Sequence, residues 1–478
     1  MPNAYPLATD WGTAPGPVVA RFLEELDTAG IVYDVSAEVR ADHGRDWWPL
    51  TIADVASGRV PHWPGVVVHP KSTSEVSALL PRAARYALAV TPQGGRSGVL
   101  GGAVAPEGGV ALDMTELDKV IAIDTISGTV DVEAGVFGPD LERAVRAEGW
   151  TVGHFPQSFE LATVGGWIAC RGAGQYSNRY GKIEDIVRAL TVVLANGDVV
   201  EVGGRGPRQA VGPDLLALFV GSEGTLGVIT RATLVMHRVG ATERRAAYAF
   251  DRFDDGLEAC RRIFQRGARP AVLRLYDDAE SQRNFDVDRC ALIVLDEGDP
   301  LLVEATMAVV DQECAAGDAL DVDLVQRWLE HRNDVGALAP LWERGIVVDT
   351  IEVSGPWITL APMRQRVVDA LLNAPGMMVA SVHQSHAYLD GACLYFTFAG
   401  RPPGDNTEFY RHAWDVATEA VLASGGALSH HHGVGRNRAR FVEAALGSGF
   451  ALLRTIKHDL DPLAIMNPGA LGVGGAPW

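Results

Sequence analysis

Three histidines stand side by side near the end of the sequence, in the stretch "SHHHGVG". Histidine can bind a metal, carry a proton near neutral pH, or lie in a polar surface turn. Two adjacent charged imidazoles repel each other, so at least one stays available as a base near neutrality. We therefore predict that His430, His431 and His432 move protons or stabilise an oxyanion beside a carbonyl. A metal site and a surface turn remain the alternatives.

Three glycine-rich stretches lie in the first half of the chain: Pro92 to Gly102, Thr163 to Gly174 and Gly221 to Val228. Glycine lets backbone N–H groups approach pyrophosphate oxygens closely. None of the three has the G-x-G-x-x-G spacing of the common dinucleotide fold, and a GK[ST] phosphate loop is absent from the sequence. The pattern predicts a large dinucleotide in a different cradle. Glycines that serve only as turn residues are the alternative.

The predicted order of strands and helices, which must position these residues, changes along the sequence. From Pro64 the chain alternates strand, helix, strand and glycine loop, and Asn196-Gly197 predicts a hairpin. Beyond Val239, longer helices alternate with strands such as "ACLYFTFAG". We predict an α+β fold with four regions: a helical segment at 1–60, a cofactor domain at 61–239, a second domain at 240–401 and a tail at 402–478. The histidines lie between two predicted helices of the tail.

Composition narrows the classes of partner and compartment. A formal net charge of -19 argues against nucleic acid, because phosphate binding needs clustered Lys and Arg. The five cysteines form no CxxC pair, which fits a reducing compartment. A signal peptide and an apolar run of about 18 residues are both absent. We expect a cytoplasmic protein with a small-molecule substrate, no nucleic-acid partner and no transmembrane segment; a homodimer is left open.

Several longer motifs resemble a known flavoprotein family. Taken in their order along the chain, these motifs are similar to those of the FAD-binding proteins of the vanillyl-alcohol oxidase and p-cresol methylhydroxylase (PCMH) type. The resemblance implies an FAD-binding domain and an α+β cap domain, with the isoalloxazine between them. The motifs are "TPQGGRSGVLGG", "DMTELDKVIAID", "VEAGV", "PQSFELATVGGWIACRGAGQYSNRYGKIEDIV", "GSEGTLGVIT" and "DPLAIMNPG".

Within that family the chain resembles the alkyldihydroxyacetonephosphate synthases, through "GRDWWP", "PQSFELATVGGW", "GACLYFTFAG" and "LSHHHGVG". The resemblance implies a catalytic group of Tyr395 with His430, His431 and His432, and a substrate-binding pair of Arg274 and His386. It also implies a set of flavin contacts. These are Pro92, Gln93, Gly94, Gly95, Arg96, Ser97, Gly98, Ser158, Thr163, Gly165, Gly166, Glu223, Gly227 and Ile229.

Two departures from the family pattern change what is expected. Relatives that tether FAD covalently often have histidine where this chain has Arg96, so we expect non-covalent FAD. The synthases have an Arg-Asp pair where this chain offers Leu338, and that arginine helps to bind substrate. The phosphorylated ketone substrate of the synthases is therefore in question for this chain.

The metal-site alternative can be compared with the sequence pattern of the metal-dependent 2-hydroxy-acid dehydrogenases of the same superfamily. Those proteins are expected to carry H-x-G-D-G-N-x-H and a glutamate in an E-H-G triplet. Here His383 and His386 could join the histidine trio, but His431 stands in the glutamate position. Loss of that carboxylate weakens divalent-metal binding, so we predict no metal.

Three functions remain open. In synthase-like chemistry a histidine removes a proton, a carboxylate leaves and an alcohol enters, without net electron transfer. In an oxidase or dehydrogenase the histidine takes a hydroxyl proton while hydride passes to the flavin, and Arg274 holds a carboxylate. The third function is that of a flavin-binding regulatory protein without turnover.

Overall fold

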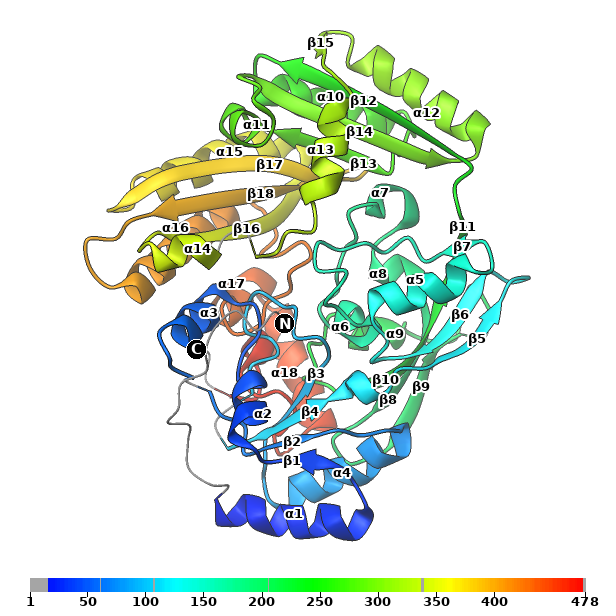
Figure 1. Cartoon of the computed structure of the whole chain (residues 1–478), viewed down its shortest axis with the longest axis vertical. Helices are drawn as coiled ribbons and strands as arrows, with labels where there is room; N and C mark the ends of the chain where they lie inside the picture. Colours follow the sequence, from blue (N-terminus) through cyan, green and yellow to red (C-terminus); the bar gives the residue numbers. More distant parts are fainter. Residues whose placement is uncertain (1–15, 61, 106–107, 205, 337–338, 476–478) are drawn as a thin grey trace.

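The computed structural model describes residues 16–60, 62–105, 108–204, 206–336 and 339–475. They form two bodies, one above the other in Figure 1. The first body, drawn below, holds a four-stranded and a five-stranded sheet and also receives the carboxyl-terminal tail. The second body is built on one sheet of seven strands. None of the helices in the described ranges is long and apolar enough to cross a membrane.

The four-stranded sheet has the order β1-β2-β4-β3, and β2, β4 and β3 run parallel. The side chains of β2 and β4 are buried on both faces, as runs of β-branched and apolar residues in a parallel sheet require. Helix α4 begins where the Ser72 hydroxyl accepts a hydrogen bond from the Glu75 N–H at 3.2 Å. The elements are β1 (Tyr33–Asp34), β2 (Val66–Val68), β3 (Val90–Gln93), β4 (Val110–Asp113), α1 (Pro17–Ala29) and α4 (Thr73–Arg85).

The five-stranded sheet is antiparallel, with the order β5-β6-β10-β8-β9. The hairpin predicted at Asn196-Gly197 is confirmed, because β8 and β9 pair around this turn and Gly197 has a φ of +87°. The elements are β5 (Val120–Asp124), β6 (Thr129–Glu133), β8 (Val187–Val193), β9 (Val199–Gly203), β10 (Val228–Val235), α5 (Gly138–Arg146), α6 (Val164–Ala169), α7 (Ser177–Tyr180), α8 (Ile183–Ile186) and α9 (Leu216–Phe219).

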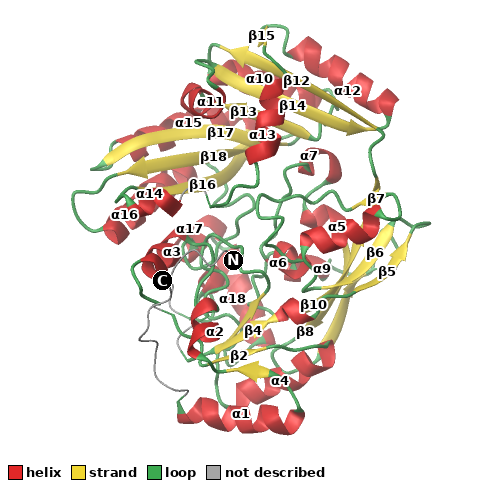
Figure 2. Cartoon of the chain, in the orientation of Figure 1, coloured by secondary structure: helices red, strands yellow, loops and turns green. Residues whose placement is uncertain are grey.

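The seven-stranded sheet of the second body has the order β15-β12-β14-β13-β17-β18-β16, and every pairing in it is antiparallel. Four helices pack on one face and form an apolar core with it (Figure 2). The strands are β12 (Thr242–Phe250), β13 (Val272–Tyr276), β14 (Cys290–Gly298), β15 (Asp318–Ala319), β16 (Val347–Pro356), β17 (Met377–Ala387) and β18 (Gly391–Gly400). The four helices are α10 (Phe253–Gln265), α12 (Pro300–Glu313), α15 (Trp357–Leu372) and α16 (Asn406–Ala423).

The opposite face of this sheet carries the shorter helices and looks toward the first body. Part of it is covered by an aromatic and apolar cluster that includes Tyr276, Phe285 and Trp328. The helices here are α11 (Asp278–Phe285) and α13 (Asp323–His331), whereas α14 (Ala339–Glu343) lies beside the edge strand β16. The rest of the face, over β17, β18 and β16, is left open toward the first body.

The first described helix and the last described part of the tail both pack in the first body, against the four-stranded sheet. The amino-terminal segment contains α1, α2 (Ala37–Asp42) and α3 (Pro49–Ala56), and residues 1–15 of the predicted helical region lie outside the described residues. The predicted domain boundaries stay predictions; α16, just beyond the boundary at 401, packs against the seven-stranded sheet. The tail then passes through α17 (Val442–Leu446) and α18 (Gly449–Leu460) and joins β3, where the Val90 N–H donates to the Ile465 carbonyl at 2.7 Å.

Candidate active site

A cavity of about 920 Å³ lies between the three glycine-rich stretches of the first body and the open face of the seven-stranded sheet. All fourteen residues predicted to contact the flavin line it. Arg274, His386, Tyr395, His431 and His432 line it as well. His430 is not among the lining residues and lies behind His431. The structure therefore brings residues from both bodies and from the tail to one cavity.

The first glycine-rich stretch is shaped to leave room for a ligand. A Cβ on Gly94 would lie 2.1 Å from Thr163 Oγ1, and one on Gly95 would lie 1.7 Å from the Leu161 carbonyl oxygen. Side chains there would push the two stretches apart. At Gly98 and Gly102 the nearest atom to such a Cβ is 3.7 Å away, and both residues line the cavity. Their missing side chains keep the cavity open, as a cradle for a dinucleotide requires.

One face of the seven-stranded sheet supplies the opposite wall. Tyr276, His383, Tyr395 and Glu352 are paired in succession across β13, β17, β18 and β16. Directly paired residues project from the same face of a sheet, so these four side chains form one row. The rings of His383 and Tyr395 are stacked, with centroids 4.7 Å apart. Burial raises the pKa of Tyr395, so its hydroxyl stays protonated and can donate a hydrogen bond to a substrate oxygen.

Two carboxylates hold the histidine loop in place. Glu352, which is fully buried, accepts hydrogen bonds from the backbone N–H groups of His430 and His432 and from Arg438 Nη1 at 2.7 Å. Burial opposes charge on Glu352, but Arg438 outweighs it and holds the pKa of this carboxyl well below its usual range. From the first body, Glu223 accepts from Val434 N at 2.6 Å and Gly435 N at 2.8 Å. The Glu223 carboxylate, predicted only as a flavin contact, therefore also anchors the loop.

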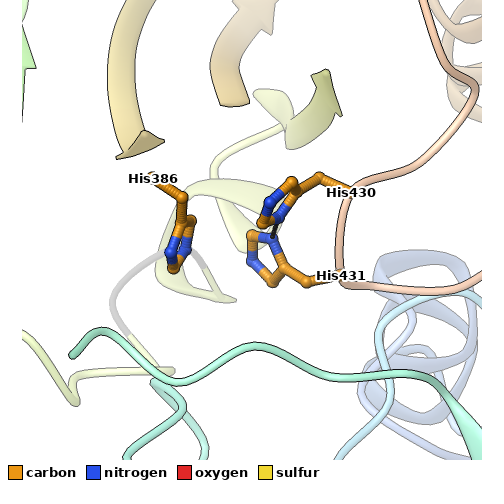
Figure 3. A group of neighbouring side chains, drawn as sticks. All are labelled: His386, His430 and His431. Carbon is orange, nitrogen blue, oxygen red and sulfur yellow. Dashed lines mark hydrogen bonds between the residues drawn. The ribbon is translucent and has the colours of Figure 1, made fainter. Parts of the chain in front are cut away.

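The histidines form a chain of hydrogen bonds. His430 Nδ1 and His431 Nδ1 are 2.8 Å apart and share one proton, and His430 Nε2 is bonded to the Tyr388 hydroxyl. His386 stacks on His430 with ring centroids 4.8 Å apart, and its Nδ1 is bonded to Ser177 at 2.8 Å. Figure 3 shows His386 facing the other two imidazoles. This arrangement can pass a proton from the cavity side at His431 to Tyr388.

Burial keeps the histidines neutral. It lowers the pKa of His430 and His431 to about 3 and that of His432 to about 4. A neutral imidazole has a free lone pair and can act as a base. The surface-turn interpretation does not fit this loop, because its three side chains are half-buried and two of them line the cavity.

Nitrogen atoms of His386, His430 and His431 lie within 4.8 Å of one another, so this group could in principle hold a metal ion. Each of these residues already has a hydrogen bond to Ser177, Tyr388 or a neighbouring imidazole. Both ring nitrogens of His430 are bonded, so a metal at His430 would have to break its bond to Tyr388 or displace the proton that it shares with His431.

Treatment with EDTA is therefore expected to leave turnover unchanged. Turnover with a reactive substrate would be measured before and after chelation, together with the metal content of the protein. Activity that is lost on chelation and returns with zinc or manganese would contradict the prediction of no metal.

His154, which was not predicted from the sequence, lies between β7 (Trp150–Thr151) and the "PQSFE" motif. It lines the cavity, only 1% of its surface is exposed, and neither ring nitrogen has a hydrogen-bond partner among the described residues. Burial lowers its pKa to about 3. A buried imidazole without partners is costly, so a bound group is expected to satisfy it. Its position just before a recognised motif was the only available signal.

Two family sequence models match the chain. The model described as "FAD binding domain" matches residues 64–203, and the one described as "FAD linked oxidases, C-terminal domain" matches residues 241–471. YgcU of Escherichia coli O157:H7, an uncharacterized FAD-linked oxidoreductase, is 31% identical over 431 residues, covering 85% of this chain and 89% of that protein. The chain belongs to the FAD-linked oxidase family, and its cofactor is FAD.

The alkyldihydroxyacetonephosphate synthase of Caenorhabditis elegans is 29% identical over 505 residues, covering 95% of this chain and 84% of that protein. A solved structure of an alkyldihydroxyacetonephosphate synthase has a TM-score of 0.79 at 25% identity, covering 97% of this chain and 87% of that one. The structure of p-cresol methylhydroxylase with bound substrate has a TM-score of 0.73 at 16% identity, covering 95% and 96%. The predicted resemblance and the α+β fold are thereby confirmed.

The residues of the cavity fit FAD, and Arg96 makes non-covalent binding the expectation. Arg96 Nη2 donates to Asp42 at 2.6 Å, and its guanidinium stands where a tethering histidine would be. Acid precipitation of the yellow protein should therefore release all of the flavin into the supernatant. Flavin absorbance would be measured in the pellet and the supernatant, and yellow colour left in the washed pellet would contradict this expectation.

Proposed function

We propose that the chain is a synthase-type FAD enzyme, which exchanges an acyl group for an alcohol on a carbon beside a ketone, without net oxidation. The observation that carries the proposal is an apolar arm of the cavity on the side away from Arg274. Arg274 lies on β13, whereas the apolar arm lies at β16, three strand spacings or about 14 Å across the sheet. Helix α3 packs on α14 and α14 on β16, which closes the arm. It is lined by Trp47, Ile52, Leu341, Trp342, Val348 and Val379.

This layout suits an amphiphilic substrate. A polar head at Arg274 would place the reacting carbon near Tyr395 and the histidines, which lie between the two sides, and would direct an alkyl or acyl chain into the apolar arm. Burial of a long chain would contribute about 0.8 kcal/mol per methylene. A hydroxy acid of two or three carbons would leave the apolar arm empty.

The side chains of the cavity divide the chemistry among them. Bound FAD would supply an isoalloxazine that can hold the electron pair of the reacting carbon for a time and give it back, so that the exchange has no net oxidation. His431 or His432 takes the C–H proton, and Tyr395 donates a hydrogen bond to the ketone oxygen. The acyl group leaves as a carboxylate, and the alcohol oxygen takes its place after giving its proton to an imidazole. The first proton then returns to the carbon, so that ester and alcohol become ether and carboxylic acid.

Oxidation of a 2-hydroxy acid is the second candidate. Arg274 has neutral hydrogen-bond partners and N–H groups that can hold a carboxylate in a bidentate pair. The same histidine would then take the hydroxyl proton while hydride passes to the flavin. The description of the family as FAD-linked oxidases supports this alternative.

Anaerobic mixing separates the two reactions. We expect an acylated dihydroxyacetone phosphate with a long-chain alcohol to give an ether product while the flavin absorbance stays that of the oxidised form. Glycolate and D-lactate should not bleach the flavin. Bleaching of the flavin by a hydroxy acid, with no ether product, would reject the synthase reaction in favour of oxidation. Free FAD without protein is the control for both experiments.

The pH dependence of turnover follows from the neutral histidines. The active form of the base is deprotonated, so activity is lost only as the pH falls through its pKa. That pKa is about 3 for His431 and about 4 for His432, against an ordinary 6.5. We expect kcat/KM to stay level as the pH falls from 6.5 toward 4, for as long as the protein stays folded. A loss of activity centred near 6.5 would show that the base is an unperturbed imidazole.

The lowered pKa values of His431 and His432 also determine how the stability of the protein changes with pH. These pKa values are lower in the folded than in the unfolded chain, so the unfolded chain binds protons first as the pH falls. The free energy of unfolding is therefore highest above pH 6.5, and it falls as the pH drops toward the folded-state pKa values. Flavin fluorescence recorded at each pH separates unfolding and FAD release from loss of the base.

A further inference from the structure

Arg332, which was not predicted from the sequence, lies beside Arg274 in the cavity wall. The Cζ atoms of both arginines lie 5.5 Å from the ring centre of Trp328, on α13. Arg274 also lies over Tyr276, and Arg332 lies over Tyr176 at 5.1 Å. Aromatic contacts of this kind hold a guanidinium plane in place while leaving its edge free to donate.

The charges around these two arginines are not balanced by the protein. Two other arginines that line the cavity have carboxylate partners: Arg96 with Asp42 at 2.6 Å and Arg283 with Glu280 at 3.3 Å. Among the described residues, Arg274 and Arg332 have no carboxylate oxygen within 4.0 Å. Arg274 donates to Tyr276 and His383, and Arg332 donates to the Gln175 side chain at 3.1 Å, so these partners are neutral. Two unpaired guanidinium groups in a partly buried wall favour a bound anion.

The buried, hydrogen-bonded pair of His383 and Glu280 holds the Arg274 side chain in position. Its Nη2 lies 2.8 Å from His383 Nε2, and a guanidinium can only donate, so His383 Nε2 is the acceptor. The His383 proton therefore sits on Nδ1 and is donated to Glu280 Oε2 at 2.8 Å. Burial opposes charge on Glu280, but His383 and Arg283 outweigh it and lower its pKa to about 2. Arg274 is thus oriented before any ligand arrives.

Arg332 is fixed by the first body. Its Nη1 donates to Gln175 Oε1, and Gln175 Nε2 donates back to the Arg332 carbonyl, both at 3.1 Å. Gln175 directly follows the second glycine-rich stretch and also lines the cavity. The second cation is therefore placed at the junction of the two bodies, where the cofactor cradle and the second body meet. Of the other charged residues in this part of the wall, Asp334 is exposed and Glu280 is paired.

We propose that Arg274 and Arg332, with Trp328 beside both, form the binding site for an oxyanion of the substrate, a carboxylate or a phosphate. The proposal rests on the proposed function, because it identifies the head group of the same substrate. Arg332 supplies a second positive charge in a chain that has leucine at position 338, where the synthases have an arginine. Position 338 itself lies outside the described residues. Arg332 is thus a specificity-determining residue that belongs to this chain's own cavity.

Equilibrium binding tests the site without turnover. Inorganic phosphate and malonate would each be titrated into the FAD-loaded protein by calorimetry, for the wild type and for Arg332→Gln. We expect the substitution to weaken binding of the preferred anion roughly 10- to 100-fold, as the loss of a charge-assisted pair should. Arg332→Lys should retain part of the affinity. Tighter binding of phosphate would identify a phosphate head group, and tighter binding of malonate a carboxylate.

The matched control is Arg327→Gln. Arg327 is on α13, the helix that ends just before Arg332, and it also carries one positive charge, but it donates to the Phe285 carbonyl and does not line the cavity. It should bind the anion as the wild type does, and flavin content confirms that each variant is folded. The proposal is overturned if neither anion binds, or if Arg332→Gln binds as tightly as Arg327→Gln. Flavin bleaching by a hydroxy acid would overturn the synthase reaction while leaving the anion site standing.

Discussion

Alanine in place of His431 should lower turnover about 10²-fold or more while FAD stays bound, because a positioned acid–base group typically contributes that much. His431 lines the cavity, has a pKa lowered to about 3, and is bonded through Nδ1 to His430. The glycine-rich stretches, which we expect to cradle FAD, do not depend on this ring. Steady-state kinetics on flavin-loaded protein, with the substrate found by anaerobic mixing, gives the measurement. His432→Ala should behave in the same way.

Two controls accompany this variant. His458→Ala removes an exposed histidine on α18 and should leave turnover unchanged. Tyr395→Phe removes only the hydroxyl that donates to the substrate oxygen, so its loss should be the smaller one. Turnover of His431→Ala within a factor of two or so of the His458→Ala value would return the histidines to a purely structural role.

Glutamine in place of Glu352 should lower the free energy of unfolding by about 3–5 kcal/mol, because it leaves Arg438 buried without a counter-charge. Both side chains are fully buried and joined at 2.7 Å. Glutamine keeps the shape but has a single acceptor oxygen, so it also loses the bond to one of the two loop N–H groups; the larger part of the loss comes from the charge. Urea unfolding at neutral pH, followed by intrinsic fluorescence, measures it.

A double variant distinguishes loss of the ion pair from loss of packing. Glu352→Leu combined with Arg438→Met replaces the pair with apolar side chains and should recover much of the stability. It should not recover turnover, because the His430 and His432 N–H groups lose their acceptor. Wild-type stability of Glu352→Gln would mean that Arg438 is compensated by other groups, and the assignment of Glu352 as the anchor of the loop would be wrong.

Several features of this protein could be predicted from the sequence because their signals are local. The glycine-rich stretches stand out by composition, and all three reach the same cavity. The hairpin at Asn196-Gly197 follows from a dipeptide that accepts positive φ. The histidine loop was recognised because three imidazoles are adjacent in the chain. Each of these predictions needs only neighbours in sequence.

Other features were settled only by tertiary structure, because they depend on which strands become neighbours. Glu352 reaches the histidine loop from 78 residues away, and His386 meets Ser177 across 209 residues. Arg332 and Gln175 are joined across 157 residues. The order β13-β17-β18-β16 puts the cationic side of the cavity at the middle strand, β13, and the apolar side at the edge strand, β16, of one sheet face.

The sequence alone therefore determined the cofactor class and the kinds of side chain that face it. Tertiary structure decided which buried carboxylates anchor the histidines, and which arginines are left without a carboxylate partner. The physical reason is that the charge state of a buried group depends on its desolvation and on the charges a few ångströms away. Strand pairing and the return of the tail to the first body bring those charges together, and no spacing along the chain records them.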